Sequence, residues 1–459
     1  MKPEQPNNRK ITIAGAGLAG SLLGVMLGQR GYQVTILERR SDTRGVESDS
    51  GRSINLALSS RGIHALKIAG LFEKVEKLLI PMKGRMLHFQ DGNEEFSPYG
   101  QRESEVIYSV SRRDLNHLMI DATVEAPLVE VKFDQQLDAV DFKNNRLGIL
   151  DLKSNQTRKE EFELLIGADG AGSRTRRSLI KEVGGKSESD FLDHDYKELE
   201  ITAGQTASGS DYQIEPNALH IWPRGGFMLI ALPNQDHSFT VTLFMPKTGE
   251  NSFEQLSERD ALVDFFKTEF PSAFKLIDNL ESDFFGNPQG RLGTVRCEPW
   301  FYKDKVLILG DAAHAIVPFH GQGMNEGFED CSELIRLLDE HDEDWAKVIP
   351  KFDEIRRPNC HAIAEMALEN YVTMRSSVAD PKFQLKKELG FKLEKRFPSR
   401  FVPRYSMVMF RLIPYAEARQ RGKIQQEILG ELVEGVESID DVDFAKAEKM
   451  ILQRLVALD

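Results

Sequence analysis

The chain has 459 residues, which is enough for about three domains of ~150 residues each. Apolar residues make up 41% and charged residues 29%, so the composition is that of a globular protein and excludes collagen-like and disordered chains. The 72 acidic residues outnumber the 59 basic ones, and no long run of Lys or Arg is present. Because a chain with a net charge of −13 is repelled by phosphate backbones, we expect no nucleic-acid partner.

The cysteines and the apolar runs indicate a protein of the cytoplasm. Cys297, Cys331 and Cys360 form no C-x-x-C pair, so neither a disulfide framework nor a zinc knuckle is predicted. The polar first residues do not resemble a signal peptide, and apolar runs such as 227–232 are far shorter than the ~20 residues of a membrane span. We therefore expect a cytoplasmic protein without a membrane span. Its oligomeric state stays open.

The first predicted elements are a strand over 10–14, a Gly-rich turn and helix over 15–30, and a strand over 33–38. Two more short apolar strands, 163–167 and 305–310, each end at a Gly-Asp or Gly-Ala-Asp turn. Short, continuous apolar strands of this kind are typical of a buried parallel sheet.

The pattern changes between residues 199 and 246. Apolar stretches at 218–222, 227–232 and 238–244 are separated by turn residues, which predicts an antiparallel meander. From 329 onward the periodicity is helical, and one face of the last helix is marked by Phe444, Ala447, Ile451, Leu455 and Leu458. The predicted fold class is α/β: a Rossmann-like domain interleaved with an antiparallel-sheet domain, followed by a C-terminal helical region.

The strongest local motif is the turn Gly15-Ala-Gly17-Leu-Ala-Gly20, which follows a strand and opens a helix. Gly15 permits the tight turn, Gly17 lets a pyrophosphate approach the backbone, and Gly20 permits close packing of helix and strand. The helix N-terminus offers free N–H groups to the phosphates. Glu38, at the end of the second strand, can accept both ribose hydroxyls, which favours FAD or NAD over NADP. The alternative is a Gly-rich turn with a purely structural role.

Two further segments, 166–176 and 309–325, favour FAD over NAD. In the second, Asp311 leaves a strand end and can hydrogen-bond the ribityl chain of a flavin. Pro318 bends the loop, and residues 321–325 begin a helix whose N-terminus can point at the pyrimidine edge of the flavin. Because that edge becomes anionic on reduction, the helix dipole would stabilise the reduced form.

Together, in this chain order, the three segments resemble those of the single-component FAD-dependent aromatic hydroxylases, the family of para-hydroxybenzoate hydroxylase. Further stretches closely resemble the kynurenine 3-monooxygenases within that family. They are 51–59 (GRSINLALS), 83–86 (KGRM), 218–223 (ALHIWP), 238–244 (SFTVTLF), 317–325 (VPFHGQGMN), 366–372 (MALENYV) and 400–407 (RFVPRYSM). The resemblance implies an FAD-binding domain over 1–78, 104–195 and 291–375, a substrate domain over 79–103 and 196–290, and a helical region over 376–459.

The resemblance implies noncovalent FAD, with NADPH as a transient co-substrate. The residues expected to bind FAD are Gly15, Gly17, Leu18, Gly20, Glu38, Ala57, Arg112, Leu137, Asp311, Gly323, Met324 and Asn325. Arg112 has a basic neighbour, Arg113, which leaves open which of the two meets the cofactor.

The resemblance also implies a substrate site for L-kynurenine. Its carboxylate would meet Arg85, Tyr99, Asn370 and Tyr405, and Phe239, Phe319 and Met374 would line the pocket for its ring. A planar guanidinium fork suits a carboxylate in a partly apolar cleft. From residue type alone, however, Arg85 could form a surface ion pair, and the aromatic residues and Met374 could belong to the core.

The implied reaction converts L-kynurenine and O2 to 3-hydroxy-L-kynurenine through a flavin hydroperoxide, in tryptophan degradation and NAD biosynthesis. No H-E-x-x-H, two-His-one-carboxylate or G-x-S-x-G motif is present, so we expect no metal and leave the chemistry to the cofactor. His320 is a tentative proton-transfer residue, and His314 is expected to be structural. The alternatives are a hydroxylase of another aminoaryl acid and a non-catalytic flavoprotein.

Overall fold

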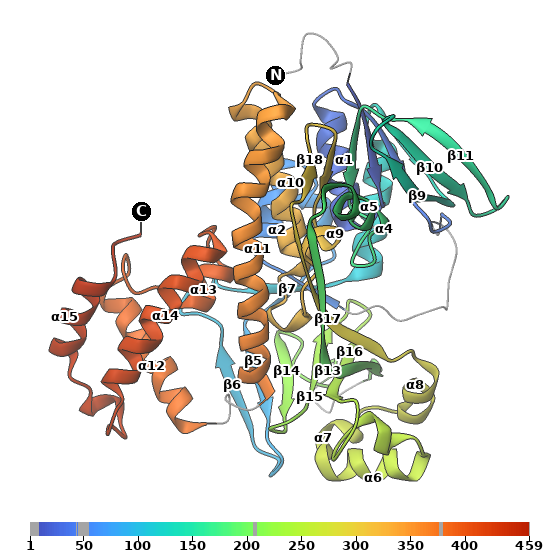
Figure 1. The fold of residues 1–459 in the computed structure, drawn as a ribbon. Coiled ribbons are helices and arrows are strands. Elements are labelled where there is room, and N and C mark those ends of the chain that lie inside the picture. Colours follow the sequence, from blue (N-terminus) through green and yellow to red (C-terminus); the bar gives the residue numbers. More distant parts are fainter. Residues whose placement is uncertain (1–8, 43, 45–54, 205–208, 376–379, 459) are drawn as a thin grey trace. The chain divides into compact units, whose positions relative to one another are not determined.

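The computed structural model describes residues 9–42, 44, 55–204, 209–375 and 380–458 (Figure 1). Part of the resembling stretch 51–59, residues 51–54, therefore lies outside the described residues. The chain divides into two compact units: unit 1 holds residues 1–79, 110–191 and 293–361, and unit 2 holds 80–109, 192–292 and 362–459. The chain first crosses between them at residues 79 and 80. It then crosses within the strands β7 (Ile107–Ser111), β13 (Lys186–Ile201) and β17 (Gly290–Glu298) and within the long helix α11 (Trp345–Arg375).

Unit 1 is built on a six-stranded sheet. Its strand order is β18 (Phe301–Tyr302), β19 (Val306–Ile308), β12 (Leu164–Gly167), β1 (Lys10–Ala14), β2 (Gln33–Leu37) and β8 (Val129–Lys132). All neighbours are parallel except β18 and β19. The four strands predicted from the sequence are thus confirmed as parallel partners, and Ile11, Ile13, Ile36 and Ile166 are fully or almost fully buried in the way a covered sheet requires.

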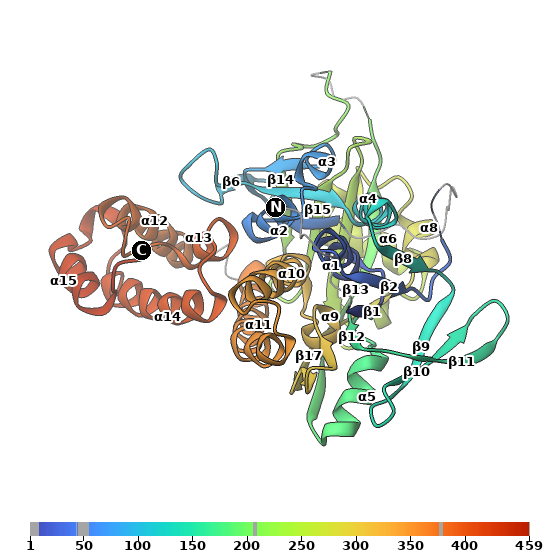
Figure 2. The same cartoon turned by 90° about the horizontal axis from the view of Figure 1, so that it is seen from above.

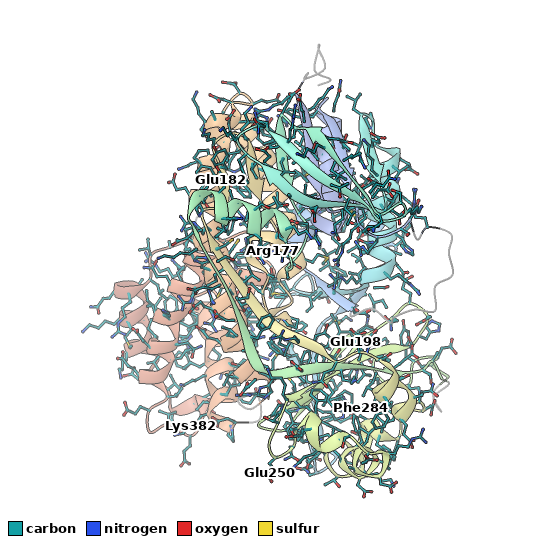
Figure 3. All side chains as sticks on the ribbon, turned by 45° about the vertical axis from the view of Figure 1, so that its right-hand side comes forward. Arg177, Glu182, Glu198, Glu250, Phe284 and Lys382 are labelled. Carbon is teal, nitrogen blue, oxygen red and sulfur yellow. The ribbon has the colours of Figure 1, made fainter. Side chains whose placement is uncertain are left out.

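Helices cover this sheet. The first helix, α1 (Leu18–Gln29), packs against α4 (Arg112–Glu125) and α10 (Gly323–Glu340), and nine of its residues are buried. Unit 1 also holds α2 (Ser60–Ile68), α3 (Phe72–Glu76), α5 (Arg174–Val183), the single turns α9 (Asp311–His314) and η2 (Pro318–His320), and the part of α11 up to His361. In α5, Thr175, Arg176 and Leu179 face inward, whereas Arg177 and Glu182 are exposed on its outer side (Figure 3). Figure 2 shows α1 beside β1 and β2.

Two smaller, three-stranded sheets are formed by segments that precede β12 and α4 in the chain. Strands β9 (Gln135–Asp141), β10 (Arg146–Asp151) and β11 (Gln156–Glu161) form an antiparallel three-stranded sheet. A second three-stranded sheet has the order β3 (Asn55–Leu58), β7, β4 (Ile80–Met82).

Unit 2 contains a seven-stranded sheet in the order β17, β13, β16 (Phe239–Pro246), β15 (Met228–Pro233), β14 (Ala218–Pro223), β5 (Gly84–His88) and β6 (Glu94–Pro98). The pairs β14–β15 and β15–β16 are antiparallel, which confirms the predicted meander, while β14 and β5 are parallel. One face is covered by η1 (Phe253–Leu256), α6 (Arg259–Glu269), α7 (Pro271–Phe274) and α8 (Leu280–Gly286). Phe266 of α6, Phe284 of α8 and Phe270, which lies between α6 and α7, form one core with the strands.

The C-terminal helices of unit 2 have a core of their own. They are α12 (Pro381–Arg396), α13 (Arg404–Met409), α14 (Tyr415–Leu432), η4 (Ile439–Asp441) and α15 (Phe444–Arg454), and α12, α14 and α15 lie side by side in both views (Figures 1 and 2). Ala447 and Ile451 are buried in this core as predicted. The predicted helical face is wrong at its end, because the helix stops at Arg454: Leu455 is extended and Leu458 lies beyond the helix, where its N–H bonds to Ser399 O. No helix of the described residues has both the length and the apolarity needed to cross a membrane.

Candidate functional site: a dinucleotide cavity and a cationic cluster

Unit 1 contains a cavity of about 450 Å³ at the carboxyl ends of its parallel strands. Its walls come from the first turn of α1, the end of β2, β3, β9, the turn after β12, and the segment from β19 to α10. Of the residues expected to bind FAD, the cavity is lined by Gly15, Gly17, Leu18, Glu38, Ala57, Arg112, Leu137, Asp311, Gly323 and Met324. Ten of the twelve residues are thus brought to one cavity of the size that ligand pockets have.

The Gly-rich turn is shaped by close backbone contacts. Gly15 has a φ of +102°, and a Cβ there would lie 2.5 Å from Ala168 O. Gly20 lies behind the lining, and a Cβ on it would come within 2.0 Å of Gly15 O. At Gly17, by contrast, a Cβ would meet nothing within 4 Å. The open space in front of Gly17 and the free N–H groups of the first turn of α1 match what a pyrophosphate needs.

Glu38 is held in place at the end of β2. The residue is 4% exposed, Oε2 accepts the N–H of Ala16 at 2.8 Å, and Oε1 accepts both the N–H and Nε of Arg40 at 2.9 Å. Burial alone would raise the pKa of Glu38, but the bonds and charge of Arg40 hold the pKa below its usual value. The carboxylate is therefore a fixed acceptor at the edge of the cavity.

The segment from 310 to 325 is fixed from behind by Asn325. This side chain is fully buried: Nδ2 donates to Ala57 O and Gly321 O, both at 2.8 Å, and Oδ1 accepts the N–H of Ser59 at 2.8 Å. Asn325 therefore supports two walls of the cavity rather than lining it. Arg112 lines the cavity at the start of α4, whereas Arg113 pairs with Asp114 at 3.3 Å, so the geometry favours Arg112 as the basic residue of the site.

A buried ion network lies under the Gly310–His314 turn, and the sequence reasoning did not find it. Asp330 on α10 accepts the N–H of Gly310 at 2.8 Å, His314 Nε2 at 2.6 Å and Arg356 Nε at 2.7 Å. Glu326 faces the other ring nitrogen of His314 at 3.1 Å. Burial opposes the charge on His314, but Asp330 and Glu326 raise its pKa well above the usual value, so the ring is an imidazolium.

His314, Glu326 and Cys360 bring their side-chain ligand atoms within 4.8 Å of one another, a spacing that a metal ion could use. Metal ligands must be a neutral imidazole and a thiolate. Here both ring nitrogens of His314 face carboxylates, and burial raises the pKa of the Cys360 thiol. The cluster therefore acts as an ion network that supports the turn at Asp311.

Unit 2 contains the residues expected to hold a carboxylate. The Arg85 guanidinium carbon lies 5.7 Å from the ring centre of Tyr99 and 5.4 Å from that of Tyr405, and the two rings are stacked at 5.2 Å. Burial raises the pKa of both phenols, so both keep their protons. Within the described residues, Arg85 Nε and the Tyr99 hydroxyl are buried without a hydrogen-bond partner. A buried donor that the protein leaves unsatisfied is costly, so Arg85 Nε is available to a ligand.

The other predicted substrate residues occupy three places. Asn370 and Met374 are one turn apart on α11, with Asn370 Nδ2 3.4 Å from Met374 Sδ. Phe239 is buried in the core of the seven-stranded sheet, edge-on to His220. Phe319 and His320 are buried in η2 of unit 1. The structure thus groups Arg85, Tyr99 and Tyr405, and the roles of the others stay predictions.

Known proteins match this chain over residues of both units. A family model described as an FAD binding domain matches residues 8–367. Curated relatives named kynurenine 3-monooxygenase include those of Stenotrophomonas maltophilia, 44% identical over 98% of each chain, and Legionella pneumophila strain Corby, 42% identical over 96% of this chain and 97% of the relative. The relative from Myxococcus xanthus is 45% identical over 97% of this chain and 95% of its own.

Solved structures share the fold at low identity. The tetrameric form of 2-methyl-3-hydroxypyridine-5-carboxylic acid oxygenase has a TM-score of 0.66 and 17% identity, covering 82% of this chain and 95% of its own. PqsL of Pseudomonas aeruginosa, in complex with 2-aminobenzoylacetate, has a TM-score of 0.64 and 18% identity, covering 80% of this chain and 97% of its own. These likenesses support the fold and carry no further argument.

Proposed function

Since this chain belongs to the kynurenine 3-monooxygenase family, we propose that it hydroxylates L-kynurenine to 3-hydroxy-L-kynurenine, using FAD, NADPH and dioxygen. The observation that carries the substrate class is the cluster of Arg85, Tyr99 and Tyr405, in which a guanidinium with an unsatisfied Nε lies against the rings of two neutral phenols. The proposed setting is the cytoplasm, in tryptophan degradation and NAD biosynthesis.

The cavity of unit 1 fits FAD by the chemistry of its walls. Gly17 and Leu18 offer backbone N–H groups to the pyrophosphate, and Glu38 accepts the hydroxyls of the adenosine ribose. Arg112 supplies a positive charge, and Asp311 and Met324 would face the flavin end. FAD, when bound, supplies the redox chemistry that takes hydride from NADPH and activates dioxygen for transfer to an aromatic ring.

In unit 2, the Arg85 fork binds the substrate carboxylate, because a planar guanidinium matches both oxygens at once. The hydroxyls of Tyr99 and Tyr405 donate hydrogen bonds to the same carboxylate. Their raised pKa values keep both hydroxyls protonated near neutral pH. Asn370 is assigned a further bond to this end of the substrate. Phe239, Phe319 and Met374 are assigned to the apolar wall around the ring, and His320 to moving a proton.

The test is NADPH consumption by the FAD-loaded protein with and without L-kynurenine, with the product identified by mass. We expect consumption to depend on L-kynurenine and the product to be one oxygen atom heavier. Product formed only from another aminoaryl acid would show a hydroxylase of different specificity. FAD binding without stimulation by any aromatic acid would show a non-catalytic flavoprotein.

A further inference from the structure

A second cation lies beside Arg85, contributed by α12. The Lys387 ammonium donates a hydrogen bond to Ser97 Oγ on β6. Ser97 is directly opposite Arg85 in the antiparallel pair of β5 and β6, and opposed residues project from the same face of a sheet. The ammonium of Lys387 and the guanidinium of Arg85 therefore share one face of these two strands.

The described residues place no carboxylate in direct contact with either cation. Among the described residues no carboxylate forms an ion pair with Arg85 or Lys387, and the groups they meet are neutral: Ser97 and the rings of Tyr99, Tyr405 and Phe391. Burial and the charge of Arg85 lower the pKa of Lys387 to about 8, while the exposed Glu95 on β6 opposes this shift. Two like charges held together in this way are stabilised by an anion placed between them.

The position of Lys387 is set by further contacts of the same helix. Glu394 lies seven residues after Lys387, two turns along the same helix face. Gln101, in the loop that follows Tyr99, donates to Glu394 Oε2 at 2.9 Å and to Phe391 O at 3.0 Å. Helix α12, whose first turn contains the labelled Lys382 (Figure 3), is thus attached to Ser97 and to Gln101, on both sides of Tyr99 in the chain.

We propose that Lys387 is a second cationic contact for the substrate carboxylate and a specificity-determining residue of this site. The proposal rests on the proposed function of Arg85 as the carboxylate anchor. With two cations and no paired carboxylate, the site should favour aryl keto acids whose carboxylate has no ammonium group beside it. It should accept α-amino acids at some cost, because two positive charges oppose the α-ammonium.

The first test measures binding of 4-oxo-4-phenylbutanoate, an aryl keto acid without any amino group, to the FAD-loaded enzyme by titration calorimetry. For Lys387→Met we expect the dissociation constant near neutral pH to rise roughly tenfold or more, as for loss of a charge-assisted bond. Lys387→Arg should remain close to the parent. The matched control is Lys392→Met on the same helix, whose ammonium pairs with Glu388 at 3.4 Å and should not affect binding.

The second test uses pH. Lys387 is charged below its pKa of about 8, so affinity of the parent should fall as pH rises from about 7 to about 9.5. Because Arg does not titrate between these pH values, the affinity of Lys387→Arg for the probe should stay constant over this pH range.

Steady-state kinetics give a third readout. With L-kynurenine as substrate, Lys387→Met should raise KM with little change in kcat, since the contact positions the carboxylate rather than the reacting ring.

Parent-like binding by Lys387→Met, or a full loss of affinity at high pH in Lys387→Arg, would overturn the proposal. If Lys387→Met does not fold, the pH profile of Lys387→Arg decides alone. A parent that binds the probe in a Lys387-dependent way but does not hydroxylate L-kynurenine would refute the proposed function and leave this inference standing.

Discussion

Glu38 and Arg85 represent two ways of holding a charged side chain ready for a ligand. The Glu38 carboxylate is fixed by bonds from Ala16 and Arg40, so its remaining lone pairs point in fixed directions toward the cavity. Arg85 is held by two aromatic rings, and its buried Nε has no partner in the described structure. A ligand at Glu38 joins an existing network, whereas a ligand at Arg85 satisfies a donor that the fold leaves open.

Replacing Glu38 by Ala should weaken FAD retention. Loss of a charge-assisted hydrogen bond costs about 1.5–3 kcal/mol, so the dissociation constant should rise roughly ten- to hundredfold. Fluorescence titration of the apoprotein with FAD measures this. Glu38→Gln, which keeps one acceptor, should lie in between, and Glu130→Ala on the neighbouring strand β8 should match the parent. Equal FAD affinity in Glu38→Ala and the parent would contradict the adenosine assignment.

Replacing Arg85 by Lys should impair catalysis although the charge is kept. An ammonium cannot form the paired bonds of a guanidinium fork, and disturbing one partner of a buried charged pair costs about 2–5 kcal/mol, so kcat/KM should fall roughly thirtyfold or more. A misplaced ring should also raise the hydrogen peroxide released per NADPH. Steady-state kinetics with peroxide detection checks both, with Arg259→Lys, an exposed residue of α6, as the control. Parent-like kcat/KM in Arg85→Lys and Arg85→Ala would show that Arg85 does not bind the substrate carboxylate.

The sequence predicts these residues unequally. Glu38 follows the Gly-rich turn at a spacing with a mechanical meaning, so the residues alone identify it. Arg85, Tyr99 and Tyr405 have no such spacing, and only the family resemblance points to them. Lys387 is 290 residues from Ser97, and the contact between them depends on packing of α12 that no local pattern records.

At the scale of elements, short strands and Gly-rich turns are the most predictable parts. Strand β1 has the predicted bounds, and the other predicted strands are displaced by only a residue or two, because apolar runs between turn residues mark them directly. The end of α15 was predicted too late, since its apolar spacing continues beyond Arg454 while the backbone does not. The Asp330 network was not predicted, because its members come from three segments that meet only in the folded unit.

That network leads to a prediction for α10. Asp330→Asn should lower the free energy of unfolding by about 3–5 kcal/mol, because it removes the one buried carboxylate of the described residues that pairs with both His314 and Arg356 and leaves only Glu326 and Glu329 to balance them. It should also weaken FAD retention, since Asp330 holds the Gly310 N–H next to Asp311. Denaturant unfolding of the apoprotein and FAD titration separate the two effects. Asp339→Asn on the same helix, where the carboxylate is 62% exposed and pairs with Arg30, should change neither. Unchanged unfolding of Asp330→Asn would show that the network adds nothing to stability.

At the scale of the whole molecule, the chain order predicts interleaving. Strands of one parallel sheet occur at 10–14, 164–167 and 306–308, and the meander of the other unit lies between the last two, so neither unit is a continuous stretch. The assignment of 376–459 as a separate helical region remains a proposal. Its helices α12, α14 and α15 share a core. Helices α12 and α13 also contribute Lys387 and Tyr405 to the group of side chains around Arg85.

A single Gly-rich dinucleotide turn in the sequence has a kinetic consequence. The chain has one G-x-G-x-x-G motif, at Gly15, and its acidic Glu38 disfavours a nucleotide with a 2′-phosphate there. NADPH must therefore bind without a dedicated Rossmann site, and we expect it to reduce FAD slowly unless substrate is present. Stopped-flow absorbance at fixed NADPH should show flavin reduction accelerated roughly tenfold or more by L-kynurenine, which corresponds to about 1.4 kcal/mol in the barrier.

Arg85→Ala should lose this acceleration at substrate concentrations that saturate the parent, because substrate must bind to act. Since reduction without substrate should be equal in both proteins, a difference there would indicate a damaged FAD site instead. Reduction of the parent at the same rate with and without L-kynurenine would exclude coupling of the two half-reactions, even if the hydroxylated product is formed.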